Sequence, residues 1–165
     1  MQQALSFEGP RVEVVRSRKR RKTISAREVD GVIRVSIPAT MSTVEEAKWV
    51  DEMVRRFQRK ASSSGVDLAE RAAALATRYR LPQPDSIRWV SNQASRWGSC
   101  TPVDRSVRIS DRLAEFPLWV LDYVLVHELA HLVVPGHNAE FKALVNRYPK
   151  AERALGYLMA KGLEG

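Results

Sequence analysis

The chain has 165 residues, of which 44% are hydrophobic and 28% are charged, so it is long enough to bury a core as one domain or as one domain with an appended lobe. No apolar run resembles a membrane span, no secretory signal is visible at the N-terminus, and the single cysteine excludes an internal disulfide, which together predict a cytoplasmic protein. The net charge of +8 favours contact with nucleic acid or another polyanion. It is also compatible with a general excess of arginine that keeps the proteins of one organism soluble.

Residues 11–38 are predicted to form a three-stranded β-meander, because valine and isoleucine recur in three short runs. The runs are residues 11–16, 23–29 and 32–37. Asp30-Gly31 is typical of the type I′ turn of a hairpin, and Pro38 ends the third strand. The first link, Arg16 to Lys22, is a run of basic residues that predicts either a solvated hairpin or a loop that binds phosphate.

Two helices are expected after this sheet. Thr43-Val44-Glu45-Glu46 has the pattern of a capping box, which predicts a helix that begins there and runs to about Lys60. Asp67-Leu68-Ala69-Glu70 has the same pattern and predicts a second helix that ends at Arg80-Leu81, before a proline.

The stretch between these helices, Ser62-Ser63-Ser64-Gly65, is the most linker-like part of the chain. It suggests a boundary between an N-terminal domain at residues 1–62, made of the meander and a helix, and a catalytic domain at residues 66–165. The two parts could equally form one continuous domain.

From residue 86 the pattern returns to strands and then becomes helical. A strand is expected at residues 86–91, followed by a hairpin whose strands are residues 96–101 and 106–110. Pro117 suits the first turn of a long helix. Two further helices are predicted, from the cap at Asn138 to about Tyr148 and from about Ala151 to Lys161.

The expected long helix carries the chemical signature of the chain. All three histidines lie within eleven residues, in the pattern His127-Glu128-Leu129-Ala130-His131 followed by His137. Helical residues four apart lie on the same face, so the imidazoles of His127 and His131 can bind one zinc ion together. Pro135-Gly136 predicts the end of the helix, which lets the chain turn and bring in His137 as a third ligand.

Three protein ligands leave one coordination position of a zinc ion open, which is typical of a catalytic site. Glu128, next to the first histidine, is placed to accept a proton from a zinc-bound water and to act as general base. The alternative is that the motif occurs by chance and that the histidines are satisfied residues of an apolar helix. A site with three histidines would also accept Co²⁺, Ni²⁺ or Mn²⁺.

Several neighbours are candidates for supporting roles. Tyr123, one turn before His127, could donate a hydrogen bond to a reacting oxygen or be a core residue. Asp122 and Glu140 are possible partners for the free N–H of a ligand imidazole, although Glu140 also suits the first turn of a helix. Cys100 is expected to be a small buried residue, because no histidine remains to activate its thiol.

The combined motifs resemble those of a known family. The residues that carry the likeness are Arg96-Trp97-Gly98-Ser99-Cys100, Val107-Arg108-Ile109, Leu113, Pro117, the run Asp122 to Leu132, His137, Phe141 and Pro149, with Arg18 to Ile24 and Val35 to Pro38 in the N-terminal part. In this pattern the chain resembles the YgjP-like metallopeptidase family, small relatives of the SprT and gluzincin-type zincins.

This resemblance implies an α+β fold with a zincin-like core, in which a small mixed sheet lies beside the active-site helix and an N-terminal β-meander and helices precede it. It also implies His127, His131 and His137 as zinc ligands and Glu128 as general base. The chain departs from the family at Ser110-Asp111, at Asn138 and at Lys142, where members tend to have Asn-Trp, Ser and Trp. None of these positions is a ligand or the base, so the departures concern the shape of the cleft.

The sequence therefore favours a zinc-dependent metallopeptidase that hydrolyses peptide bonds. The hairpin at residues 96–110 is expected to hold an extended peptide by strand addition, along Val107 to Ile109. Two other hypotheses stay open: a metal-dependent hydrolase of a non-peptide bond such as a nucleotide phosphoanhydride, and a nucleic-acid-associated protease or binding module like the SprT relatives. Trp97 is expected to pack under the active-site helix.

Overall fold

The structure, a computed structural model, describes residues 10–162 and divides into two compact units, one up to Gln58 and one from Arg59 onward. The N-terminal stretch that shows no secretory signal lies outside the described residues. In the described part of the chain, no helix is both long enough and apolar enough to cross a membrane. The predicted division into domains at residues 1–62 and 66–165 stays a proposal.

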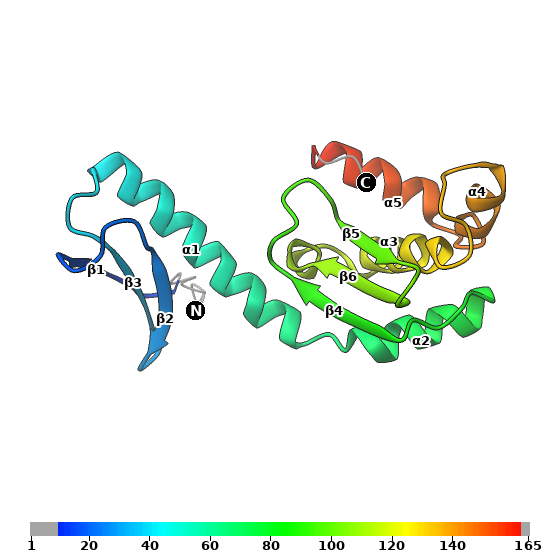
Figure 1. Cartoon of the computed structure of the whole chain (residues 1–165), viewed down its shortest axis with the longest axis horizontal. Helices are drawn as coiled ribbons and strands as arrows, with labels where there is room; N and C mark the ends of the chain where they lie inside the picture. The colour runs from blue at the N-terminus through cyan, green and yellow to red at the C-terminus, as the bar shows by residue number, and fades with distance from the viewer. Residues whose placement is uncertain (1–9, 163–165) are drawn as a thin grey trace, which may run out of the picture. The chain divides into compact units, whose positions relative to one another are not determined.

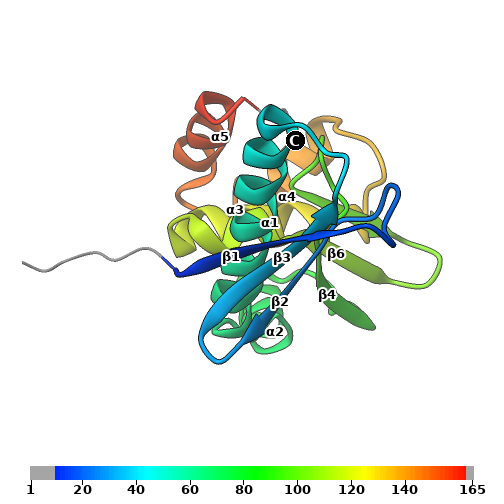
Figure 2. The same cartoon turned by 90° about the vertical axis from the view of Figure 1, so that its left-hand side faces the viewer.

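The first unit is built on a three-stranded sheet with a helix. Its elements are β1 (Val12–Ser17), β2 (Ser25–Val29), β3 (Val32–Pro38) and most of α1 (Thr43–Ser64), whose last residues, from Arg59, belong to the second unit. β3 is the central strand, with β1 parallel to it and β2 antiparallel to it (Figure 2). Ile33, Val35 and Ile37 of β3 are buried, and apolar residues of α1 pack against them.

The predicted meander is therefore wrong in its order, since β1 and β2 lie on opposite edges of β3. The basic link from Arg18 to Lys22 crosses between those edges and does not close a hairpin. The reason lies in the apolar content of the strands. β3 buries the most side chains, so it takes the central position, where strands pair on both of its sides.

Local signals in this unit are largely confirmed. Asp30 and Gly31 both have positive φ, at 52° and 75°, as a type I′ turn requires. The capping box of α1 begins at Ser42, one residue earlier than predicted, because the Ser42 hydroxyl accepts from the Glu45 N–H at 3.3 Å.

The first three residues of the predicted linker, Ser62 to Ser64, are helical, and the hydroxyls of Ser63 and Ser64 donate to carbonyls one turn earlier.

The second unit combines a mixed sheet with four α-helices and a short 3₁₀ segment. Its elements are α2 (Leu68–Tyr79), β4 (Ser86–Val90), β5 (Gly98–Thr101), β6 (Ser106–Ser110), η1 (Asp111–Glu115), α3 (Leu118–His131), α4 (Ala139–Val145) and α5 (Ala151–Ala160). β6 is central, parallel to β4 and antiparallel to β5. The predicted α+β class and the hairpin formed by β5 and β6 are confirmed.

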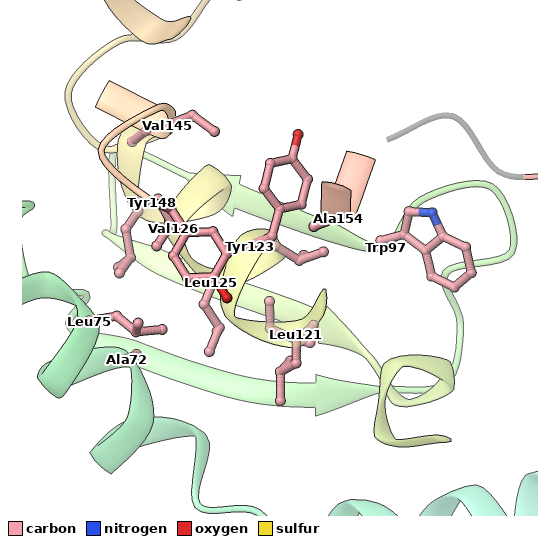
Figure 3. Close-up of a cluster of buried hydrophobic side chains, with 14 of the residues drawn as sticks. Ala72, Leu75, Trp97, Leu121, Tyr123, Leu125, Val126, Val145, Tyr148 and Ala154 are labelled. Atoms are coloured by element: carbon pink, nitrogen blue, oxygen red, sulfur yellow. The ribbon is translucent and has the colours of Figure 1, made fainter. Parts of the chain in front are cut away.

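Helix α3 is the centre of this unit. It packs against the sheet through β5 and β6 and against α2, α4 and α5 (Figure 1). Leu121, Leu125 and Leu129 are at most 1% exposed and belong to the hydrophobic core of this unit. Figure 3 shows Leu121 and Leu125 among buried residues from the surrounding elements. Burying each leucine contributes about 1.5–3 kcal/mol to folding. The helix that carries the histidine motif is therefore held on all sides.

A salt bridge fixes α2 to α3. The Arg71 guanidinium donates to both carboxylate oxygens of Asp122, with N–O distances of 2.5 and 2.9 Å, and the Asp122 side chain is only 15% exposed. A comparable pair between Arg105 and Asp85 has side chains 42% and 69% exposed. The two pairs differ chiefly in burial.

We expect Asp122→Ala to lower the free energy of unfolding by about 1–3 kcal/mol, because the partly buried Arg71 guanidinium loses both acceptors. Asp85→Ala is the matched control and should cost less than about 1 kcal/mol, as exposed pairs do. Urea unfolding of the two variants measures this difference. Equal losses would contradict a special role for the Arg71–Asp122 pair.

Candidate metal centre

The three histidines come from the end of α3 and the loop that follows it. His127 and His131 lie one turn apart, and α3 ends at His131. The N–H groups of Val133 and Val134 both donate to the Ala130 carbonyl, at 3.0 and 2.9 Å, which closes the last turn. The chain then reverses through Pro135-Gly136, so the predicted helix end is confirmed and His137 is carried back toward α3.

The ring nitrogens of these histidines converge on one point. The Nε2 atom of His127 lies 3.2 Å from Nε2 of His131 and 3.2 Å from Nε2 of His137. Tetrahedral zinc with Zn–N bonds of about 2.0–2.1 Å requires nitrogen atoms about 3.3 Å apart. The spacing and the donor type therefore fit a divalent metal ion.

Burial keeps His127 and His131 in the protonation state that binds metal. Burial lowers the pKa of His127 to about 3, with a smaller contribution from His131 and then His137. Burial is likewise the main reason why the pKa of His131 is lowered. Neutral imidazoles offer lone pairs, which protonated ones do not.

Neighbouring groups orient these rings. Nδ1 of His131 lies 3.0 Å from the Val134 carbonyl, so its N–H donates there and Nε2 is left as the free acceptor. The Phe141 ring contacts all three imidazoles, with centroids 4.3 Å from His131, 4.8 Å from His137 and 4.9 Å from His127. Sequence reasoning noted Phe141 only as part of the family likeness.

The predicted imidazole partners do not serve that role. Asp122 pairs with Arg71 and not with a histidine, because α2 packs alongside α3 at that position. Glu140 is exposed in the first turn of α4, and within residues 10–162 it has no hydrogen bond to a histidine. The backbone carbonyl of Val134 takes the place that the sequence had suggested for a carboxylate.

Glu128 is 6% exposed and lies against β5. A Cβ atom at Gly98 would be 2.7 Å from Oε1 of Glu128, so this carboxylate occupies the space that a side chain at residue 98 would fill. Burial raises the pKa of Glu128 to about 8, and the positive charge of Arg96 partly opposes this. Sequence reasoning missed Gly98, although an isolated glycine in a predicted strand signals a close approach of this kind.

Two cavities meet at the histidines. One has a volume of about 570 Å³ and is lined by Glu128, Arg96 and all three histidines, among other residues. The other, of about 380 Å³, shares Tyr123, His127 and His137 with the first. The Tyr123 ring is largely buried, and its hydroxyl points away from the neighbouring core side chains (Figure 3).

The hairpin residues lie close to these cavities. Trp97 is buried against Phe116, with ring centroids 5.1 Å apart, and it lines the larger cavity. Cys100 is partly buried, and burial is the main cause that raises the pKa of its thiol to about 11, so the thiol is unreactive at neutral pH, as expected.

The predicted track for a peptide needs correction. Val107 to Ile109 belong to β6, which is the central strand and already pairs with β4 and β5. Its backbone groups are therefore not available for an added strand. β4 and β5 are the edge strands of this sheet, and it is residues of β5 that line the larger cavity.

Comparison with known proteins identifies a family and a related fold. A family model described as the YgjP-like metallopeptidase domain matches residues 7–158. The fold is similar to that in the crystal structure of the metallopeptidase zymogen abylysin of Pyrococcus abyssi, with a TM-score of 0.50 and 17% sequence identity. The similarity covers 56% of this chain and 92% of that one. No curated protein sequence matches the chain.

We expect Gly98→Ala to lower the free energy of unfolding by about 1–3 kcal/mol, because the new methyl group meets the buried Glu128 side chain. Gly156→Ala is the matched control, since a Cβ at that position on α5 meets nothing within 4 Å, and it should stabilise the helix by about 0.5–1 kcal/mol. Urea unfolding of metal-free protein tests both variants.

The same measurement in a Glu128→Ala background isolates the contact. Removing the Glu128 carboxylate should take away most of the cost of Gly98→Ala, because the two side chains compete for one space. An unchanged cost in that background would mean that Gly98 is needed for another reason.

Proposed function

The chain belongs to the YgjP-like metallopeptidase family, and from this premise we propose that it is a zinc-dependent peptidase. His127, His131 and His137 would hold the ion, and Glu128 would be the general base. The observation that carries this proposal is the convergence of three imidazole nitrogens near one buried carboxylate. Zinc is proposed because three histidine ligands with one open coordination position are the usual arrangement of a catalytic zinc site.

A bound zinc ion supplies Lewis acidity, which polarises a carbonyl group and lets water ionise near neutral pH. Glu128 accepts the proton of the attacking water and returns it to the leaving amine. Two features of the chain suit Glu128 to this exchange. Its carboxylate is held in one place against Gly98, and burial raises its pKa to about 8, which strengthens it as a base.

The substrate peptide is proposed to lie along β5. An extended chain can add its backbone hydrogen bonds to this edge strand, and the two cavities on either side of His127 and His137 then accept side chains from both sides of the cleaved bond. Tyr123 lines both cavities and could donate a hydrogen bond to the oxygen that becomes negatively charged.

The other hypotheses from the sequence have weaker support. The family and the structural neighbour are both described as metallopeptidases, which gives no support to a nucleotide phosphoanhydride as substrate or to nucleic acid as partner. A cytoplasmic location remains a proposal from the single cysteine.

We expect the native protein to contain about one zinc ion per chain and His137→Ala to lose most of it, since two histidines do not complete the site. His137 is exposed, so its replacement should leave the fold intact. Elemental analysis measures the metal, and circular dichroism checks the fold. Full zinc retention in a folded His137→Ala protein would remove His137 from the ligand set.

We expect Glu128→Gln to keep its zinc and to lower kcat/KM for peptide hydrolysis by about 10²–10⁴, the usual loss of a general base. Internally quenched peptides provide the assay. Glu115→Gln is the control, because Glu115 is exposed in η1 and lines neither of the two cavities at the histidines. A Glu128→Gln protein as active as Glu115→Gln would rule out the proposed base.

A further inference from the structure

The charged side chains that line the larger cavity beside the histidines differ in how accessible they are to a ligand. Among the residues that line it, Arg96 and Glu128 are the only arginine, lysine or acidic residues. Glu128 is buried at the back, against β5, whereas Arg96 is exposed just before that strand. A substrate that enters this cavity therefore meets a guanidinium group at its wall.

The main chain at Arg96 is held in place. The Arg96 carbonyl accepts a hydrogen bond from Nη2 of Arg112 at 3.4 Å. The Arg112 guanidinium in turn lies over the Trp97 ring, 4.6 Å from its centroid. This packing fixes the start of β5 and hence the point from which the Arg96 side chain projects.

The Arg96 side chain itself has no acidic partner within residues 10–162. No salt bridge or hydrogen bond joins its guanidinium to another side chain there, although its charge acts on Glu128 across the cavity. Other arginines of this unit are neutralised, as Arg71 is by Asp122 and Arg105 is by Asp85. Arg96 is thus a cation in the cavity that is free to bind a ligand.

The smaller cavity does not expose a positive charge alone. Lys142 and Glu152 both line it and both are exposed, so side chains of both signs are accessible there, whereas the one acidic residue of the larger cavity, Glu128, is buried. Selection by charge is therefore expected on the Arg96 side only. A guanidinium group binds a carboxylate through two parallel hydrogen bonds, and it repels a lysine or arginine side chain at the same place.

We propose that Arg96 is the specificity-determining residue of the larger cavity and that it binds a carboxylate of the peptide substrate next to the cleaved bond. The carboxylate is either an acidic side chain or the free C-terminus of the peptide. This inference rests on the proposed peptidase function, since it concerns the substrate of that site.

Binding to an inactive form tests the inference without relying on turnover. The protein is zinc-loaded Glu128→Gln, and the probes are fluorescent peptides of one sequence with Asp or Asn at each position in turn, each made with a free or an amidated C-terminus. We expect one acidic position, or the free C-terminus, to improve the dissociation constant at least about tenfold, the usual effect of one charged hydrogen-bonded pair. The position that responds identifies the source of the carboxylate.

Arg96→Gln in the same background should abolish this preference, and Arg96→Glu should reverse it in favour of peptides with Lys at that position. Arg88→Gln is the matched control, because Arg88 is an exposed arginine on β4 that lines neither of these cavities. It should keep the preference of the parent protein.

Peptide hydrolysis by protein that retains Glu128 separates the outcomes further. Loss of kcat/KM in Arg96→Gln for acidic peptides only, carried mainly by KM, supports the inference. An equal loss of kcat for every peptide would overturn it, because Arg96 would then act on the reaction itself. A charge preference in binding without any zinc-dependent hydrolysis would overturn the peptidase proposal and leave the carboxylate site standing.

Discussion

The burial of α3 on every side is the constraint on which the rest of the second unit depends. Leu121, Leu125 and Leu129 have almost no exposed surface, so the helix cannot rotate or shift without losing several kcal/mol of apolar contact. His127 and Glu128 lie on that same helix and inherit its rigidity. Neighbouring positions on one rigid helix place an imidazole and a carboxylate side by side with little conformational entropy left to lose.

Burying a carboxylate on such a helix requires space and compensation. Gly98 provides the space, because its missing side chain lets Glu128 lie against the backbone of β5. The positive charge of Arg96 compensates part of the cost of burial. The hairpin and the helix are therefore interdependent, which accounts in physical terms for the joint presence of an Arg-Trp-Gly run and a His-Glu motif in one chain.

Features set by neighbouring residues could be predicted from the sequence, whereas features set by distant contacts could not. The turn at Asp30-Gly31 and the end of α3 before Pro135 depend on local backbone preferences, and both are confirmed. The parallel pairing of β1 with β3 depends on which strand buries the most surface, which a strand pattern alone does not rank. Asp122 pairs with Arg71, 51 residues away, and no local signal identifies that partner.

Two of the expected departures from the family, at Asn138 and Lys142, lie in α4 and its N-cap. Asn138 caps α4 by accepting from the Phe141 N–H at 2.9 Å, so a serine there could make the same bond. Lys142 lines the smaller cavity, where a tryptophan would fill space and remove a charge. Neither residue lies on α3, although Phe141, between them in the sequence, contacts all three imidazoles. A substitution at the exposed Lys142 can therefore alter the smaller cavity while the histidines keep their geometry, whereas a substitution at Phe141 would disturb them.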